Sequence, residues 1–173
     1  KKILVVYFPR TGEEYSVGRI TKGNTAIVAE MIAQKTGADI FEVKAATPYP
    51  DNYDACTELA KKELESNARP AIAGNVDNLA QYDTIFIGYP NWWADMPMPV
   101  YTFLESYDFT DKTIIPFNTH EGSGDAGTYK TIKNLLTTSN VIDTGLSIKG
   151  SIARSSKGKT MTLNWLKTIG YIL

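Results

Sequence analysis

The residues best suited to chemistry near the amino terminus lie between an apolar segment, 3–6, and an amphipathic helix that begins at Asn24. They form two short groups, YFPRTG over 7–12 and KGNT over 22–25. Hydroxyl and amide groups between a buried strand and a helix can hold an anion, because the helix dipole presents its positive end there. The pattern indicates a phosphate site. The alternative is an ordinary strand–helix connection in which Asn24 is a plain cap.

Two later loops carry an aromatic group and a glycine-rich group. Trp92 and Trp93 are adjacent, and nearby prolines stiffen their loop, so we favour an aromatic platform for a planar ligand over core packing. Loop 118–125 contains Gly122 and Gly124, which let the backbone approach a flat polar ring and hydrogen-bond to it. A phosphate cradle, an aromatic slab and a backbone-lined slot suit a phosphorylated planar ring.

The elements that must position these loops alternate along the chain. Apolar segments predict strands at 2–8, 39–44, 83–89, 113–117 and 141–149. Amphipathic spacing predicts helices from Asn24 to near Gly37, over 51–66, over about 97–105, around Ile132 and around Trp165. Such alternation is typical of an α/β protein in which a five-stranded, doubly wound parallel sheet lies between two helix layers. Right-handed crossovers place every strand-to-helix loop at one edge of the sheet, so the three loops should converge there.

Local features predict further details of this frame. Segment 12–22 has too few apolar residues for a core element, so we expect a surface excursion, a lid or a hairpin. Pro116 donates no backbone hydrogen bond, so strand pairing should break or bulge there, and Gly145 should interrupt the last strand. Cys56 lies on a helical stripe that we interpret as packed core rather than as a nucleophile site, together with Tyr53, Ala60 and Leu64.

Composition restricts the class of protein. The chain has 173 residues, 43% hydrophobic and 21% charged, which is typical of a single globular domain over 1–173. A net charge of −1 without a basic cluster argues against nucleic-acid binding. One Cys and one His argue against a disulfide and a metal site. No apolar run is long enough to span a membrane, so we expect a cytoplasmic protein, and a removed leader before Lys1 stays open.

In this order and spacing, the motifs resemble the flavodoxin family over essentially the whole chain. The resemblance is carried by Tyr7-Phe8-x-x-Thr11 with Gly23-Asn24-Thr25, by Gly88-Tyr89-Pro90-x-Trp92-Trp93, by Asn118-Thr119-x-x-Gly122-Ser123-Gly124, and by the ending Trp165-Leu166-x-x-Ile169-Gly170. It implies a flavodoxin-like sheet of strand order 2-1-3-4-5 and an FMN cofactor.

The resemblance also implies which residues touch the cofactor. The phosphate would be held by Thr11, Asn24 and Thr25, with Arg10 and Gly23 adjacent. The isoalloxazine ring would be flanked on one side by Pro90, Asn91, Trp92 and Trp93, and on the other by Thr119, Glu121, Gly122 and Ser123.

The chain departs from the family pattern in three places. Pro9 stands where the family usually has Ser or Thr, so the cradle lacks one hydroxyl and one N–H. The excursion 12–22 splits a motif that is normally contiguous, although the two halves can still meet if it folds out locally. The net charge of −1 does not match the strongly acidic flavodoxins, whose charge suits docking to basic partners.

The function implied by the resemblance is transfer of electrons or hydride through the bound flavin, to a redox partner protein or a small aromatic substrate. One alternative is a flavin-dependent NAD(P)H reductase of quinones or nitroaromatics, and another is a flavin-free scaffold, to which only Pro9 points. A phospho-signalling receiver is rejected, because its acidic residues are missing after the first and third strands. No P-loop or dinucleotide fingerprint is present. His120 could donate to the ring or a substrate, although a lone loop histidine is more often a bystander.

The loop after the third strand has no glycine between Gly88 and Pro97. We therefore expect left-handed backbone angles to be unfavourable in this loop, by roughly 1 kcal/mol or more at Ala94. A loop that resists such angles favours transfer of electrons in pairs over single-electron carriage.

Overall fold

The structure is a computed structural model that describes residues 2–10, 12–14, 18–20 and 22–173. Five parallel strands of its main sheet lie in the spatial order β4, β1, β7, β8, β10. Numbered along the chain, this order is 2-1-3-4-5, so the predicted doubly wound topology is confirmed. The bounds are β1 (Ile3–Tyr7), β4 (Asp39–Glu42), β7 (Thr84–Pro90), β8 (Thr113–His120) and β10 (Leu146–Lys149).

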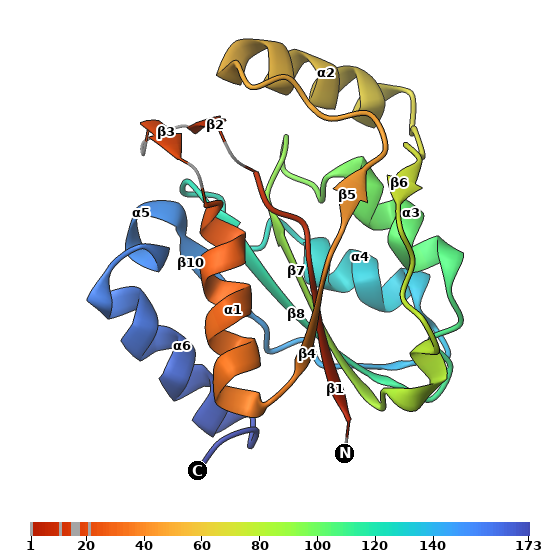
Figure 1. Cartoon of the computed structure of the whole chain (residues 1–173), viewed down its shortest axis with the longest axis vertical. Coiled ribbons are helices and arrows are strands. Elements are labelled where there is room, and N and C mark those ends of the chain that lie inside the picture. The colour runs from red at the N-terminus through yellow and green to blue at the C-terminus, as the bar shows by residue number, and fades with distance from the viewer. Residues whose placement is uncertain (1, 11, 15–17, 21) are drawn as a thin grey trace.

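Helices cover both faces of the sheet (Figure 1). One face carries α1 (Asn24–Thr36), α5 (Gly150–Ala153) and α6 (Ser156–Thr168), and the other carries α3 (Met98–Ser106) and α4 (Thr128–Leu135). Helix α2 (Tyr53–Glu65) lies above the carboxyl ends of the strands instead (Figure 1). A short 3-10 helix, η1 (Leu79–Gln81), precedes β7.

The central strands are apolar throughout because both of their faces are covered. Along β1, Leu4 and Val6 belong to the core cluster under α3 and α4, whereas Val5 and Tyr7 belong to the cluster under α1 and α6. Successive side chains of a strand point to opposite faces, so a strand between two helix layers needs apolar residues at every position. This requirement explains the continuous apolar runs in the sequence.

The excursion after β1 folds into a hairpin. Its strands, β2 (Gly12–Glu14) and β3 (Gly18–Ile20), pair antiparallel with Gly12 opposite Ile20. The chain then returns to its starting point, because a Cβ added to Gly23 would lie 2.7 Å from the carbonyl oxygen of Arg10. Gly23 is therefore required by close approach of two backbones. The two halves of the split motif meet, as predicted for a local excursion.

The fifth predicted strand is divided in two. Strands β9 (Asn140–Val141) and β10 both pair with β8, and the chain between them contains Gly145. A side chain at Gly145 would collide with the carbonyl oxygen of Pro116. The interruption at Gly145 is therefore confirmed. The expected break at Pro116 is wrong for its pairing with β7, where Ile87 and Pro116 stay in register.

A small antiparallel pair beneath α2 was not predicted from the sequence. It consists of β5 (Lys44–Ala45) and β6 (Ile72–Ala73). Each strand has only two residues, too few to show an alternating pattern, and the second lies in a segment that reads as irregular.

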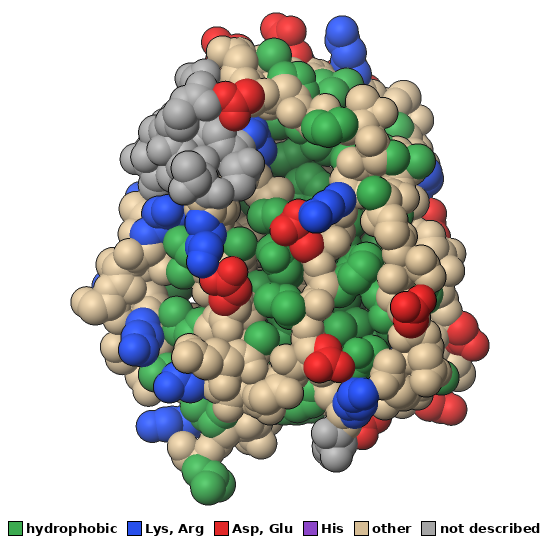
Figure 2. Space-filling model, in the orientation of Figure 1, with side chains coloured by type: hydrophobic (Ala, Val, Ile, Leu, Met, Phe, Trp, Pro, Cys, Tyr) green, Lys and Arg blue, Asp and Glu red, His purple; other side chains and the backbone are tan. Residues whose placement is uncertain are grey.

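The surface carries side chains of both charges. Basic and acidic side chains both occur on the face shown in Figure 2, in keeping with the net charge of −1. Across the described ranges of the chain, no helix is long and apolar enough to cross a membrane. Within the same ranges, no group of three or more His, Cys, Asp or Glu side chains could hold a metal ion.

The close contact between β7 and β8 yields a stability prediction. A Cβ at Gly88 would overlap the ring of Phe117, which is fully buried on the neighbouring strand. Gly88→Ala should lower the free energy of unfolding by about 1–3 kcal/mol, because overpacking forces the ring from its preferred position. Urea denaturation measures this, and adding Phe117→Leu should make the alanine less harmful. An equal effect of the alanine in both backgrounds would contradict the overlap.

Candidate functional site

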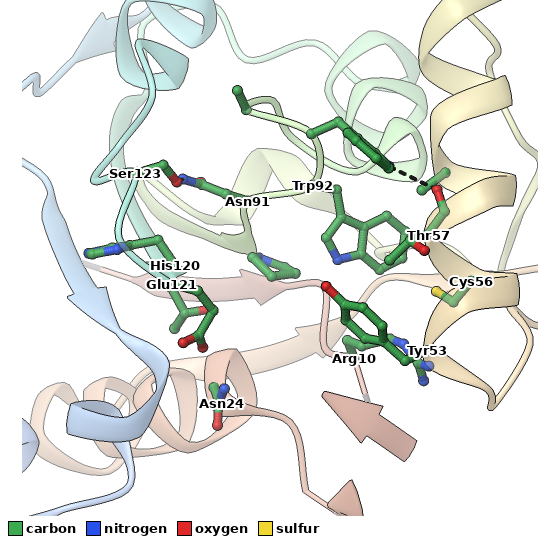
Figure 3. A pocket seen from close by; sticks show the side chains of 15 residues that line it. Arg10, Asn24, Tyr53, Cys56, Thr57, Asn91, Trp92, His120, Glu121 and Ser123 are labelled. Atoms are coloured by element: carbon green, nitrogen blue, oxygen red, sulfur yellow. Dashed lines mark hydrogen bonds between the residues drawn. The ribbon is translucent and has the colours of Figure 1, made fainter. Parts of the chain in front are cut away.

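A cavity of about 340 Å³ lies at the carboxyl edge of the sheet, where the loops after β1, β7 and β8 meet α2 (Figure 3). The described residues that line it are Arg10 and Asn24 from the first loop, 90–94 from the second, Thr119, His120, Glu121 and Ser123 from the third, and Tyr53, Cys56, Thr57 and Ala60 from α2. The three loops therefore converge as their order in the sheet predicts.

Most of the residues predicted to touch a cofactor share this cavity, namely Arg10, Asn24, Pro90, Asn91, Trp92, Trp93, Thr119, Glu121 and Ser123. Gly23, Thr25 and Gly122 are not among the described lining residues, and Thr11 lies outside the described part of the chain. Thr25 is buried, and its hydroxyl shares a 2.9 Å hydrogen bond with that of Thr119. Thr25 therefore supports the wall, and its contact with a cofactor stays a prediction.

The amino end of α1 combines several features that suit an anion. Its N-cap residue is Gly23, which has no side chain to cap this end, and the first turn contains no acidic residue. The Arg154 guanidinium donates to the side-chain oxygen of Asn24 (2.9 Å) and to the carbonyl of Lys22 (2.8 Å), which fixes the Asn24 amide. The Arg10 guanidinium lines the same cavity and donates to the carbonyl of Asp51 (2.9 Å). The helix dipole and the Arg154 guanidinium favour an anion at this end of the cavity, whereas the Arg10 guanidinium is bonded toward α2 and the Glu121 carboxylate adds a negative charge near Asn24.

Trp92 belongs both to the cavity wall and to the apolar core. Its ring packs edge-on against Phe8, with ring centroids 5.2 Å apart, and against Tyr49, with centroids 4.9 Å apart. These contacts restrain the indole before any ligand is bound. Core packing and a place in the cavity wall are therefore not exclusive for Trp92, and its stacking on a planar ligand stays a prediction.

Trp93 and the residue after it adopt left-handed backbone angles. Their φ values are 53° at Trp93 and 58° at Ala94, between Trp92 and Asp95, whose backbones exchange two hydrogen bonds (2.8 and 3.1 Å). Positive φ at both central residues is the pattern of the tight hairpin turns that usually need Gly or Asn. The expectation that this glycine-free loop would avoid such angles is wrong. Its corollary, transfer of electrons in pairs, loses that support.

Contacts from two helices hold the strained turn in place. The Asp95 carboxylate accepts from the Tyr101 hydroxyl (2.6 Å) and from the Met96 backbone N–H (2.7 Å). Burial, with Asp95 next, raises the pKa of Tyr101, so this phenol keeps its proton. On the other side, the Trp93 indole N–H donates to the Thr57 carbonyl of α2 (2.8 Å). These hydrogen bonds offset the strain of the left-handed backbone angles, which neither residue favours by itself.

Asn118 joins the second loop to the third. It is fully buried, and its amide nitrogen donates to the side-chain oxygen of Asn91 (2.9 Å) and to the carbonyl of Gly124 (2.8 Å). The Tyr129 hydroxyl donates to its side-chain oxygen (2.5 Å). The Asn91 amide nitrogen in turn donates to the Ser123 hydroxyl (2.9 Å) and to Gly124 (2.7 Å). The Asn91 side chain thus holds two loops together, and the ring contact predicted for it would come from its backbone.

His120 is held as a neutral imidazole. Its Nδ1 accepts a hydrogen bond from the backbone N–H of Gly122 (2.9 Å), so the neutral ring carries its proton on Nε2. Burial, and then the charge of Lys149 on the neighbouring strand, lowers the pKa of His120. The ring can therefore donate one hydrogen bond and, through Nδ1, order the glycine-rich loop.

Glu121 lines the cavity beside Asn24, and its predicted contact with the ring stays a prediction. Its carboxylate and the Asn24 amide both lie against Gly150, where a Cβ would collide with either side chain. Figure 3 shows the two side chains directed toward one another. Glu121 therefore lies at the α1 end of the cavity, and Gly150 is the residue that leaves room for it.

The α2 wall is the part of the site that sequence reasoning missed. Tyr53, Cys56 and Ala60 were recognised as a helical stripe but assigned to the core. Cys56 and Ala60 are indeed buried, yet both line the cavity, together with Thr57. The i, i+3, i+7 spacing was a correct signal for a covered face. The spacing could not show that this face lines a cavity instead of packing against the sheet.

Comparison with known protein families finds a match over nearly the whole chain. Residues 2–169 match the family model described as flavodoxin. The chain belongs to the flavodoxin family. A comparison with curated proteins finds no match.

Solved structures of flavoproteins share its fold. A protein from Bacteroides eggerthii assigned as a flavoprotein is 28% identical, with 97% of each chain covered and a TM-score of 0.76. A flavoprotein from Lactobacillus acidophilus, solved in complex with FMN, is 24% identical, with 88% of this chain and 95% of that one covered and a TM-score of 0.67. Oxidised flavodoxin 2 from Bacillus cereus is 17% identical, with 99% of this chain and 97% of that one covered and a TM-score of 0.56.

The buried amide of Asn118 should be important for stability. Asn118→Ala leaves the Tyr129 hydroxyl and the side-chain oxygen of Asn91 without this partner, and each buried group left unsatisfied lowers the free energy of unfolding by about 1–3 kcal/mol. Tyr129→Phe removes only one donor and should cost less. Urea denaturation of both variants makes the comparison. Equal losses in the two variants would show that Asn118 does not join the loops energetically.

The chain's single histidine makes its protonation directly measurable. In a proton NMR titration the His120 midpoint should lie below the usual 6.5. Because the folded state binds its proton less tightly than the unfolded state, the free energy of unfolding should fall as pH drops below about 6.5. His120→Gln should lack this part of the pH dependence. A midpoint at or above 6.5 would contradict the lowering of the His120 pKa by burial and Lys149.

Proposed function

We propose that the chain binds FMN in the cavity and transfers electrons through the bound flavin. The observation that carries this proposal is the meeting of three loops around one cavity, with an electropositive helix end, two indoles and a glycine-rich backbone. Membership of the flavodoxin family and likeness to a protein solved with FMN support it. A volume of about 340 Å³ lies within the usual range of small-molecule sites.

The residues at the α1 end suit the phosphate. Asn24, the backbone N–H groups of the first turn and the Arg10 guanidinium would bind it, and Arg154 would keep Asn24 in place. The Arg10 guanidinium would replace the hydroxyl and N–H that Pro9 removes from the family's usual cradle. Charge-assisted hydrogen bonds of this kind are about twice as strong as neutral ones.

The loops after β7 and β8 suit the ring. Trp92 or Trp93 would stack on it, and the backbone of 119–123 would hydrogen-bond to its polar edge. Asn118 and His120 act indirectly, because their bonds set the shape of these loops. When bound, FMN supplies the redox chemistry, and the chain binds the ring, orients it and excludes water.

A flavin-dependent reductase of quinones or nitroaromatics is a second candidate. The observation that favours it is α2, which forms a wall of the cavity and is bonded to Trp93. A wall at that place restricts access by a docking protein more than access by a small molecule. Sustained NAD(P)H oxidation by the holoprotein with added quinone would distinguish a reductase from a carrier.

The phosphate assignment predicts a difference between FMN and riboflavin. Asn24→Ala should weaken FMN binding by about 10- to 150-fold, because a hydrogen bond to a charged group contributes about 1.5–3 kcal/mol. Riboflavin, which lacks the phosphate, should bind the variant and the wild type equally. Titrations followed by flavin absorbance and fluorescence measure both affinities, with exposed Asn164→Ala as the matched control.

Two outcomes would count against the proposal. A protein that stays colourless with added FMN is the flavin-free scaffold, and the function proposed above is then wrong. If Asn24→Ala lost affinity for FMN and for riboflavin equally, the assignment of the phosphate to the α1 end would be wrong.

A further inference from the structure

Charge is distributed unevenly over the molecule. Residues 39–111 carry thirteen acidic and four basic side chains, whereas residues 144–173 carry five basic side chains and no acidic one. Figure 2 shows basic side chains gathered over α5 and α6, at the left of the molecule, and acidic ones mainly on the other side. We call the five basic residues the basic face: Lys149, Arg154, Lys157, Lys159 and Lys167. They form no run in the sequence, so neither the sequence nor the net charge of −1 makes them apparent.

The basic face keeps its charge. All five of its residues are exposed, and none forms an ion pair with another described residue. Arg154 donates to neutral oxygen atoms, the carbonyl of Lys22 and the side-chain oxygen of Asn24. Glu30 on the adjacent helix α1 is paired with Lys22 instead, at 2.7 Å. The five cations are therefore available to a partner of opposite charge.

Two of these cations lie where they disfavour their own helix. Lys157 and Lys159 follow the first residue of α6, whose first turn contains no acidic residue. The helix dipole favours Asp or Glu at this end and disfavours Lys. Among the described residues, neither ammonium group has a hydrogen-bond or ion-pair partner that would offset this cost. The two lysines are thus unfavourable for folding, and a contact outside the chain would give them a role.

The basic face adjoins the cavity. Arg154 bonds Asn24, which lines the cavity, and Gly150 of α5 lies against Asn24 and Glu121. A molecule docked on α5 and the start of α6 is therefore next to the α1 end of the cavity. Among the described residues, no large hydrophobic side chain is exposed on α5 or α6. The face thus suits a polar, transient contact rather than a permanent dimer or insertion into a membrane.

We propose that the basic face docks the acidic surface of a partner protein. Opposite charges steer such an encounter and orient the partner, and a transient complex needs little apolar area. A symmetric dimer through this face is disfavoured, because two basic faces repel each other. An extended anion, such as a membrane surface or duplex DNA, is disfavoured because the acidic residues of 39–111 would repel it. What the partner exchanges at the cavity rests on the proposed function, whereas the docking itself needs no flavin.

The proposal is tested with a charge-reversal variant, Lys157→Glu with Lys159→Glu. Its matched control is Lys62→Glu with Lys130→Glu, which changes the net charge equally at exposed positions of α2 and α4. Cytochrome b5 is the probe, because it is a small protein with an acidic surface. Its binding to the isotope-labelled, FMN-loaded protein is measured by NMR titration at low salt, which gives the affinity and the residues contacted. FMN affinity is measured first for each protein.

In the wild type, cytochrome b5 should shift amide signals of α5 and α6, and high salt should abolish the binding by screening. The α6 variant should bind cytochrome b5 about tenfold or more weakly, and the control within about twofold of the wild type. FMN affinity should be unchanged in both. The α6 variant should also unfold at the same or a higher temperature than the wild type, since glutamates suit the start of a helix. Lost docking could then not be attributed to lost folding.

Four outcomes would overturn the docking proposal. They are equal weakening in both variants, which would assign the binding to net charge, shifted signals away from α5 and α6, absence of binding to the wild type, and preference for another anion. The last is tested with vesicles containing phosphatidylserine and with duplex DNA. If either bound the wild type more tightly than cytochrome b5 and lost this binding in the α6 variant, the occupant of the face would not be a protein. Failure of the wild type to bind FMN would instead overturn the proposed function, because the docking can be measured without the flavin.

Discussion

The buried amide of Asn118 is the interaction on which the shape of the site depends. Its three hydrogen bonds reach Asn91, Gly124 and Tyr129, and so connect the loop after β7, the loop after β8 and helix α4. A buried amide is stable only if its donors and acceptor are satisfied, which restricts the two loops to one relative position. Trp92 and Ser123, one from each loop, consequently line the same cavity in fixed relative positions. The shape of the cavity thus depends on a group that is not among its described lining residues.

A second constraint is the left-handed turn at Trp93 and Ala94. Neither residue favours positive φ, so the turn persists only because Asp95 and the Trp93 indole are bonded on both sides. Strain of this kind is found where surrounding structure over-determines the backbone. The bond from Trp93 to α2 couples the two features: the same indole stabilises the turn, lines the cavity and positions the wall opposite. The second loop and α2 therefore behave as one unit.

The residues that line the two ends of the cavity differ in their chemistry. The amino end of α1 and Asn24, which Arg154 orients, lie at one end together with Glu121, and the uncharged side chains of α2 form the wall at the other. A phosphorylated ring would satisfy both requirements, because its phosphate needs the first and its planar body the second. Gly23 and Gly150 make this arrangement possible by close approach, since a Cβ at either position would collide with Arg10, Asn24 or Glu121. Backbone packing and ligand chemistry are thus specified by the same few residues.

The sequence by itself determined the sheet, the helices around it and the three loops, because buried strands, amphipathic stripes and glycine-rich turns leave local patterns. It also indicated a local excursion after β1, an interruption at Gly145 and most of the lining residues. Three features depend on long-range contacts and appear only in the folded chain. The stripe of α2 lines a cavity, the Asn91 side chain is hydrogen-bonded to Asn118, and Ala94 has left-handed backbone angles. Each depends on a partner distant along the chain, from 27 residues between Asn91 and Asn118 to 36 between Thr57 and Trp93. Local propensity carries no information about such partners, so these features become visible only when the chain is folded.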